Sequence, residues 1–256
     1  MVEVVVDWRR SVAENAKACY DRSKKLKAKL DGMGKAIAET RRKLDSAVEE
    51  PVNTPRIVRK PERKWYEKFR WFTSTDGFMV LGGRDATTNE LLVKKHLEPN
   101  DLVFHAQIQG APFFVVKNPE GRVIPEATLR QAACAAASYS RAWAKGMGSA
   151  DVYHVKPGQV SKTPPAGEYL PKGAFMVYGE KTWHKGVELK AAVGLVDGRV
   201  VGGPPEAVLA QTGEYVVLGV GDTPQGELTR KVKARLRGAE SDDIQRFLPP
   251  GGGEII

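Results

Sequence analysis

The stretch KWYEKFRWFTSTDGFMVLGGRDATTNELLVKKHL, residues 64–97, decides the fold class of this chain. Its apolar segment 77–82 predicts a strand, and the pair Gly82-Gly83 predicts a turn after it. The run Thr87-Thr88-Asn89-Glu90 has the pattern of a capping box and predicts a helix over about 88–97. A strand, a glycine turn and a short helix in this order indicate a domain that mixes α and β structure.

Further short segments, rich in Val, Phe and Tyr and bounded by Gly, Pro or Asn, predict strands at 101–106, 113–117, 151–155 and 174–178. An alanine-rich segment predicts a helix over 125–145, with Pro125 in its first turn. We therefore predict an α+β fold, a mostly antiparallel sheet with packed helices. Beyond residue 189 the pattern predicts a hairpin at Asp197-Gly198, a short helix from Pro205, a strand over 215–220 and a basic helix over 228–237.

The N-terminal segment predicts a helical, coiled-coil-like arm over about 7–44. Ser11 and Glu14 have capping-box spacing, and a thin apolar stripe follows them. Gly32 and Gly34 leave open whether the arm is one rod or two antiparallel helices. Because the stripe is narrow, we expect a coiled-coil partner, either another protein or a second copy of the chain through residues 1–45.

Composition changes sharply after the arm. Residues 51–64 contain three prolines and five basic residues, which disfavours a helix and predicts an extended linker. We therefore divide the chain into an arm (1–50), a linker (51–62), a globular domain (63–190) and a small α/β C-terminal extension (191–256).

The basic residues are concentrated at the N-terminus. The chain has a formal net charge of +9, and residues 1–70 hold 19 Lys and Arg against 11 Asp and Glu. This asymmetry predicts a polyanionic partner, nucleic acid before a membrane, although a solvated helix face would also explain it. The two cysteines, Cys19 and Cys134, lack metal-ligand spacing, and no apolar stretch is long enough to cross a membrane. We expect a cytoplasmic protein without a metal or another cofactor.

The segment Gly82-Gly83-Arg84-Asp85 resembles a phosphate-binding loop only in part. It lacks the lysine of a P-loop and the three glycines of a dinucleotide fold. The glycine turn, Arg84 and the N–H groups at the helix start could still receive one phosphate of a polymer backbone. Alternatively, the glycines only allow the turn, and Arg84 pairs with Asp85 or Glu90.

Aromatic and basic side chains interleave at the start of the globular domain. This pattern suits RNA bases that stack on rings while cations meet phosphates. Alternatively, half or more of the rings form the edge of the core. The long loop 156–172 is a second candidate for contacts. The aromatic residues of the first region are Trp65, Tyr66, Phe69, Trp71 and Phe72.

Three segments, 64–97, 101–118 and 155–185, resemble the NFACT RNA-binding domain in order along the chain. That family belongs to proteins that bind stalled large ribosomal subunits in ribosome-associated quality control. The resemblance covers about 63–190, while 1–45 resembles the end of the family's coiled-coil arm and 191–256 the C-terminal extension of archaeal-type members.

The resemblance implies a non-catalytic domain that binds tRNA or ribosomal RNA on the large ribosomal subunit. Members that tail stalled nascent chains leave bond formation to the ribosome and carry further domains that this sequence does not show, so we transfer no tailing activity. His105-Ala106 is followed by Gln107, where the family often has an acid. The predicted RNA contacts are Arg63, Lys64, Lys68, Arg70, Gly82, Gly83, Arg84, Asn89, Lys94, Lys95, His105, Lys156, Ser161, Lys162 and Lys172.

Two other functions remain open from the sequence. A metal-dependent nuclease would use carboxylates and histidines to hold Mg²⁺ or activate water, although none has a recognised ligand spacing. A protein-interaction module would dock on ribosomal protein and use the arm as half of a coiled coil. The candidate nuclease residues are Arg84, Asp85, Glu90, Asp101, His105 and His154.

Overall fold

The computed structural model describes residues 7–47, 64–163 and 170–256. The chain divides into two compact units, Met1–Pro61 and Glu62–Ile256. The predicted linker lies outside the described residues. The arm and the larger unit are described in turn.

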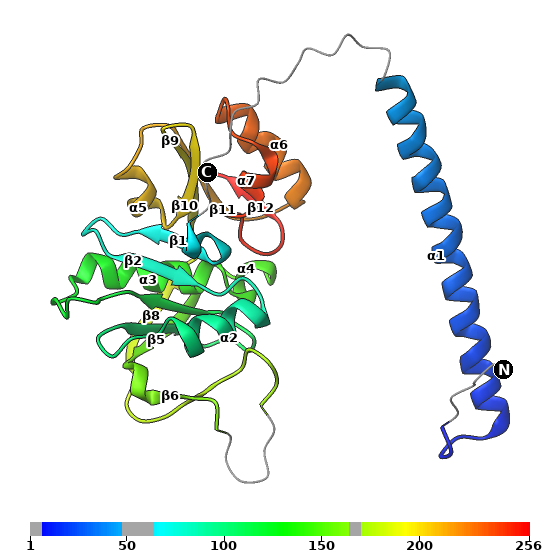
Figure 1. Ribbon diagram of the computed structural model, residues 1–256, viewed down its shortest axis with the longest axis horizontal. Coiled ribbons are helices and arrows are strands. Elements are labelled where there is room, and N and C mark those ends of the chain that lie inside the picture. Colours follow the sequence, from blue (N-terminus) through cyan, green and yellow to red (C-terminus); the bar gives the residue numbers. More distant parts are fainter. Residues whose placement is uncertain (1–6, 48–63, 164–169) are drawn as a thin grey trace. The chain divides into compact units, whose positions relative to one another are not determined.

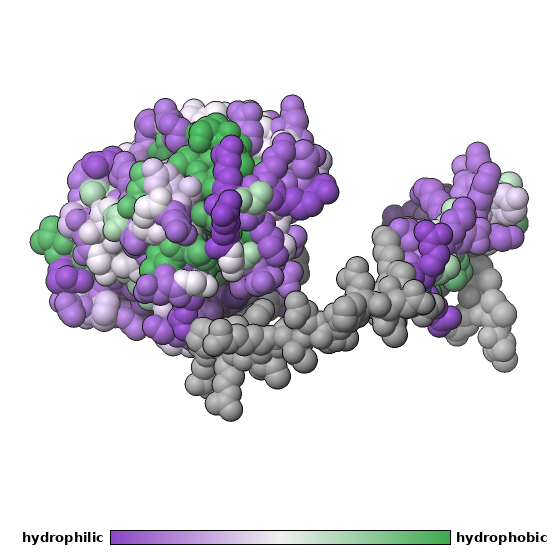
Figure 2. All heavy atoms as spheres, turned by 90° about the horizontal axis from the view of Figure 1, so that it is seen from above, coloured by the Kyte–Doolittle hydropathy of each residue, from purple (hydrophilic) through white to green (hydrophobic). Residues whose placement is uncertain are grey.

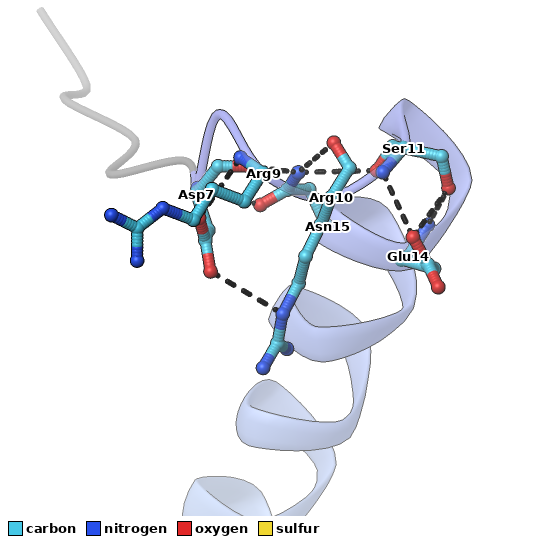
Figure 3. Close-up of polar contacts among 6 residues, drawn as sticks. All are labelled: Asp7, Arg9, Arg10, Ser11, Glu14 and Asn15. Atoms are coloured by element: carbon cyan, nitrogen blue, oxygen red, sulfur yellow. Dashed lines mark hydrogen bonds and ion pairs between the residues drawn. The ribbon is translucent and has the colours of Figure 1, made fainter.

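The arm is one continuous helix, α1 (Val12–Ala47). Its start is the predicted capping box, in which the Ser11 N–H donates to Glu14 Oε2 over 2.8 Å and the Glu14 N–H donates to Ser11 Oγ over 3.3 Å (Figure 3). The box is confirmed. The Glu14 pKa lies below its usual value because the Ser11 N–H and the Ser11 hydroxyl both donate to its carboxylate. The helix runs through Gly32 and Gly34, so the alternative of two antiparallel helices is wrong.

The apolar stripe of α1 is exposed. Within Met1–Pro61, the described residues include no buried side chain. A helix that presents apolar groups to water gains little from tertiary packing, and the predicted coiled-coil partner stays a prediction. The large apolar side chains on this helix are Val12, Tyr20, Leu26, Leu30, Met33 and Ile37.

The second unit is built on a six-stranded sheet (Figure 1). All of its pairs are antiparallel, which confirms the predicted α+β class. The predicted strand over 174–178 is only β7 (Met176–Val177), which pairs with β6 (Val160–Ser161). In spatial order the six strands are β1 (Arg70–Thr73), β2 (Met79–Gly82), β4 (Phe113–Val116), β3 (Leu102–Ala106), β5 (Ser149–Val155) and β8 (Thr182–Glu188).

Helices cover both faces of this sheet (Figure 1). The predicted helix over 125–145 is two helices, α3 (Glu126–Ser138) and α4 (Arg141–Ala144), because Ser140 Oγ accepts the Ala142 N–H and starts a new helix. These pack on one face through a cluster of alanines. On the other face lies α2 (Ala86–Lys95), preceded in the chain by a short 3-10 helix, η1 (Trp65–Lys68). A second 3-10 helix, η2 (Pro157–Gln159), follows β5.

A four-stranded antiparallel sheet follows in the chain. Asp197 and Gly198 both have positive φ, 49° and 75°, as a type I′ hairpin turn requires, which confirms the predicted hairpin. In spatial order its strands are β10 (Arg199–Gly203), β9 (Ala191–Val196), β11 (Tyr215–Thr223) and β12 (Gly253–Ile255), and the helices are α5 (Pro205–Leu209), α6 (Gln225–Arg235) and α7 (Ser241–Gln245).

The two sheets share one hydrophobic core. Phe72 and Trp143 belong to the same buried cluster as Leu218 and Leu228. A Cβ on Gly203 would lie 2.9 Å from Phe72 Cβ, so a glycine is needed where β10 meets β1. Residues 191–256, predicted as a small α/β C-terminal extension, therefore continue the core of the preceding region.

Hydrophilic residues dominate the face of the second unit shown in Figure 2, and apolar residues gather near its middle. Within the described ranges, no helix is long and apolar enough to cross a membrane.

Candidate nucleic-acid interface

The α2 face of the six-stranded sheet carries most of the predicted contacts. Leu92 of α2 is fully buried against Leu81 and Val115 of the sheet. Val93 packs on a neighbouring cluster that also includes Phe175, from the loop between β6 and β7. The apolar stripe of α2 thus fixes the helix on the sheet and holds the loop beside it.

The Gly82-Gly83 turn at the start of this helix is required by packing. A Cβ on Gly82 would collide with the ring of Phe114, and a Cβ on Gly83 would lie 2.8 Å from the Asn89 Cα. The Gly83 N–H donates to the Phe113 carbonyl over 3.1 Å. Both glycines are therefore needed for close packing, and the Gly83 N–H already has a partner.

The helix starts two residues earlier than predicted, because Asp85 is its N-cap rather than Thr87. The Thr88 N–H donates to Asp85 Oδ1 over 2.8 Å, while the N–H groups of Arg84 and Asp85 donate to Thr88 Oγ1 over 2.9 and 3.0 Å. The hydrogen bond from Thr88 holds the Asp85 pKa below its usual value. These amides are capped from within. The Arg84 side chain at this turn is exposed, and its charge helps to lower the Asp85 pKa.

Asn89 joins three elements and does not face solvent. Its Oδ1 accepts the Phe113 N–H over 2.8 Å, and its Nδ2 donates to the Gly173 carbonyl over 2.7 Å. The Asn89 side chain is buried, so we remove it from the proposed RNA contacts. It connects β4, α2 and the loop, and the contact of Gly173 with Ala86 brings the loop against the helix start.

Glu90 and Lys162 strengthen the same junction. Glu90 accepts a hydrogen bond from Lys94 over 2.7 Å and one from the Gly173 N–H over 2.9 Å, which together lower its pKa to about 2. Lys162 Nζ donates to the carbonyls of Pro171 and Ala174 over 2.9 and 3.0 Å. The Lys162 ammonium group is therefore engaged in hydrogen bonds within the loop between β6 and β7, and we remove Lys162 from the proposed contacts.

Arg70 is a structural cation. Its Nη1 donates to the Leu248 carbonyl over 3.2 Å, and its guanidinium lies 4.3 Å above the ring of Tyr139. Burial lowers the Arg70 pKa and raises the Tyr139 pKa to about 12. The guanidinium ties β1 to the C-terminal segment, so Arg70 is also removed from the proposed contacts.

His105 is held in its neutral form. Its Nε2 lies 3.1 Å from the Ala111 carbonyl and its Nδ1 lies 3.4 Å from the Tyr153 hydroxyl. Burial lowers the pKa of His105 to about 4, with a smaller contribution from Lys181. A neutral, engaged imidazole is a poor phosphate ligand, so His105 too is removed.

Exposed cations gather where η1 meets the end of α2. The ring of His96, the C-cap of α2, lies half-buried there. Burial lowers the His96 pKa, and the neighbouring charges of Lys68, Lys117 and Lys95 lower it further. Lys117 pairs with Asp101, whereas Lys68 and Lys95 are exposed. The structure thus brings together two predicted contacts that lie 27 residues apart in the sequence.

The other predicted contacts occupy varied positions. Lys64, Lys94, Lys156 and Lys172 are exposed, and Lys94 pairs with Glu90. Ser161 is half-buried and its hydroxyl accepts the Thr163 N–H over 3.0 Å. Arg63 lies outside the described residues.

The sequence prediction missed one basic and aromatic group, on β5 and the edge strand β8. Lys185 lies 4.3 Å from the ring centre of Trp183, and Lys181 lies 4.4 Å from that of Tyr153. The Trp183 and Tyr153 rings meet edge to face at 5.3 Å. The alternation Lys-Thr-Trp-His-Lys could have revealed the group, because residues two apart in an extended segment point to the same side, and Lys181 immediately precedes β8.

The candidate nuclease residues do not form one site. Asp85 is a helix cap, Glu90 holds the loop, and Asp101 pairs with Lys117. His154 Nδ1 lies 2.9 Å from His184 Nε2. In the part of the chain that the structure describes, no group of three His, Cys, Asp or Glu side chains is arranged to hold a metal ion.

Comparison with known proteins identifies the domain. Residues 68–179 match the family described as the NFACT protein RNA binding domain. The archaeal Rqc2 homolog aRqcH of Methanocaldococcus jannaschii is 42% identical over 201 residues, which cover 76% of this chain and 30% of that protein. The ribosome quality control complex subunit NEMF homolog of Drosophila melanogaster is 40% identical over 198 residues, covering 75% and 20%.

The human ribosome quality control complex subunit NEMF is 40% identical over 175 residues, which cover 66% of this chain and 16% of that protein. This chain thus spans less than a third of the length of these relatives. A solved structure of the C-terminal part of the fibronectin/fibrinogen-binding protein from Streptococcus suis aligns with a TM-score of 0.40 and 20% identity over 70% of this chain and 77% of that one. The family match and the archaeal relative together show that this chain carries an NFACT protein RNA-binding domain of the archaeal type.

Proposed function

We propose that the chain is a non-catalytic RNA-binding module that acts on tRNA or ribosomal RNA at the large ribosomal subunit, in ribosome-associated quality control in the cytoplasm. The family match supports RNA as the ligand, and relatives named as ribosome quality control subunits support the setting. The carboxylates that a nuclease would need have structural partners, which supports a role without catalysis.

The observation that carries this proposal is the placement of the exposed cations. Lys68 and Lys95 lie around His96 at one end of α2. At its other end lies Arg84, and the contact of Gly173 with Ala86 brings the segment that contains Lys172 against the same helix start. Exposed cations at both ends of one short helix fit a polyanionic backbone that runs along it.

The first test measures binding of fluorescently labelled tRNA, and of single-stranded DNA of equal length, at several salt concentrations. If cations meet phosphates, the logarithm of affinity falls with the logarithm of salt by about 0.7 to 0.9 per contact. We expect steep dependence and a preference for tRNA. Absence of binding at low salt would refute the proposal.

Single substitutions locate the surface. Arg84→Ala should weaken tRNA binding by roughly 1.5 to 3 kcal/mol, the value of a charge-assisted hydrogen bond, and Lys95→Ala should reduce the salt slope by about one contact. Arg199, exposed on β10, supplies the matched control, and Arg199→Ala should change neither quantity. An Arg84→Ala variant that is folded and binds normally would remove Arg84 from the interface.

Deletion of residues 1–62 tests the contribution of the arm. The remainder forms a compact unit of its own, so it should fold, while its salt slope and general affinity for tRNA decrease. Unfolding of the remainder would contradict the proposed boundary.

A second candidate function is protein interaction through the arm. The exposed apolar stripe of α1 favours it, because such a stripe needs a helical partner to be buried. Association through this stripe should depend little on salt and should be lost on Leu30→Glu, which sedimentation can measure against the neutral surface change Thr40→Ala.

A further inference from the structure

Trp65 presents a large aromatic ring to solvent. The residue is 52% exposed, whereas Trp143 of the same unit is 2% exposed. One face of the Trp65 ring stacks on the ring of His96, with centroids 4.7 Å apart and planes 18° apart. With one face covered and half of its surface open, the ring offers a flat apolar platform to a ligand.

The platform is held rigidly from below. The His96 N–H donates to the Leu92 carbonyl over 3.0 Å, which anchors the backing residue to α2. The buried ring of Phe69 lies nearly perpendicular to both rings, with its centroid 5.4 Å from that of His96 and 6.4 Å from that of Trp65. A ring fixed in this way loses little conformational freedom when a ligand stacks on it.

Positive charge surrounds the platform. Lys64, the N-cap of η1, and Lys68, its last residue, are both exposed. Lys68 and Lys95 both act on His96, from η1 and from the last turn of α2. An exposed ring with cations on two sides matches the arrangement by which proteins hold unpaired nucleotides, because every base has an aromatic face and every nucleotide a phosphate.

We propose that Trp65 is the stacking platform for one unpaired RNA base, and that Lys68 and Lys95 meet the phosphates next to it. This inference rests on the proposed RNA-binding function and adds the structural class of the ligand. Within a duplex each base is paired and covered on both faces by its neighbours, so the platform selects unpaired bases in single strands, loops or overhanging ends.

The experiment compares three probes of equal length, about 20 nucleotides, chosen to exceed the span of one stacking site. They are an unstructured oligoadenylate RNA, a blunt RNA duplex, and an abasic strand that keeps the phosphates without bases. The proteins are the full chain and its variants Trp65→Leu and Trp65→Tyr. Leucine keeps an apolar side chain without an aromatic face, and tyrosine keeps the face.

We expect Trp65→Leu to bind oligoadenylate about 5- to 150-fold more weakly, which is the range for loss of one base–aromatic stack. The same variant should bind the duplex and the abasic strand as the unchanged chain does, and its salt slope should not change. Trp65→Tyr should restore most of the affinity for oligoadenylate. Thermal unfolding of each variant establishes that the fold is kept.

An equal loss on all three probes would overturn the inference, because the ring would then support the surface rather than stack on a base. An unchanged affinity of Trp65→Leu for oligoadenylate would also overturn it. Failure of the proposed function is a different result, since the unchanged chain would then bind none of the probes in a salt-dependent way.

Discussion

Asn89 should hold together the junction of β4, α2 and the loop that contains Gly173. The substitution Asn89→Ala tests this. The substitution removes the acceptor of the Phe113 N–H and the donor to the Gly173 carbonyl, at 2.8 and 2.7 Å. It leaves the rest of the helix unchanged. The Asn89 side chain is 6% exposed and Phe113 is 3% exposed, so water cannot readily replace the lost partner.

Each buried polar group left without a partner costs about 1 to 3 kcal/mol. The Gly173 carbonyl belongs to a half-buried residue and should lie at the low end of that range. We therefore expect the free energy of unfolding to fall by about 2 to 4 kcal/mol. With a urea slope of about 2.5 kcal/mol/M, the midpoint of unfolding should fall by about 0.8 to 1.6 M.

The assay is equilibrium urea unfolding followed by circular dichroism. Thr87→Ala is the matched control, because Thr87 is exposed on the same helix and should lie within about 0.5 kcal/mol of the unchanged protein. If Asn89→Ala shifts the midpoint no more than this control, then the two hydrogen bonds do not hold the junction of β4, α2 and the loop, and the reasoning is refuted.

Three further predictions concern ionisable groups. Arg70→Lys should lower the melting temperature, because lysine cannot reproduce the carbonyl contacts and the stacking on Tyr139, while tRNA affinity of the folded protein stays unchanged; a weaker affinity at unchanged stability would return Arg70 to the interface. His105 has a pKa of about 4 in the folded protein against 6.5 when exposed, so the unfolded chain takes up the proton first and stability should fall as the pH drops from 6.5 to 4. His105→Gln should make the melting temperature depend less on pH between 6.5 and 4. An unchanged pH dependence would contradict the conclusion that buried His105 stays neutral in the folded protein. Glu90 has a pKa of about 2 against 4.5, so its contribution is present above pH 4.5 and is lost toward pH 2; Glu90→Gln should therefore lower the melting temperature at pH 6 more than at pH 3.

Local patterns in the sequence predicted local structure well. The Ser11 and Glu14 capping box and the Asp197-Gly198 hairpin are both confirmed, because each depends on residues at most three positions apart. The start of α2 was predicted two residues too late, because the local sequence offers two residues that can cap the helix. Both Asp85 and Thr87 can cap a helix, and the tight fit of Gly83 against Asn89 accompanies the earlier start.

Strands β1 and β8 were not predicted, since their burial is set by partners far along the chain. Trp71 of β1 packs on Phe247, and Trp183 of β8 packs on Tyr153 of β5. Neither strand shows a clean alternation of apolar and polar residues, which is the pattern that would have predicted a strand from the sequence.

The sequence by itself determined the α+β class, the helical arm and the family resemblance, because these follow from short-range patterns and from motifs in order. The tertiary structure alone decided which cations can reach a ligand. Lys68 and Arg70 are two residues apart beside the same aromatic rings, yet Lys68 is exposed while Arg70 donates to the Leu248 carbonyl, 178 residues away. Burial depends on contacts between distant segments, and no local pattern carries that information.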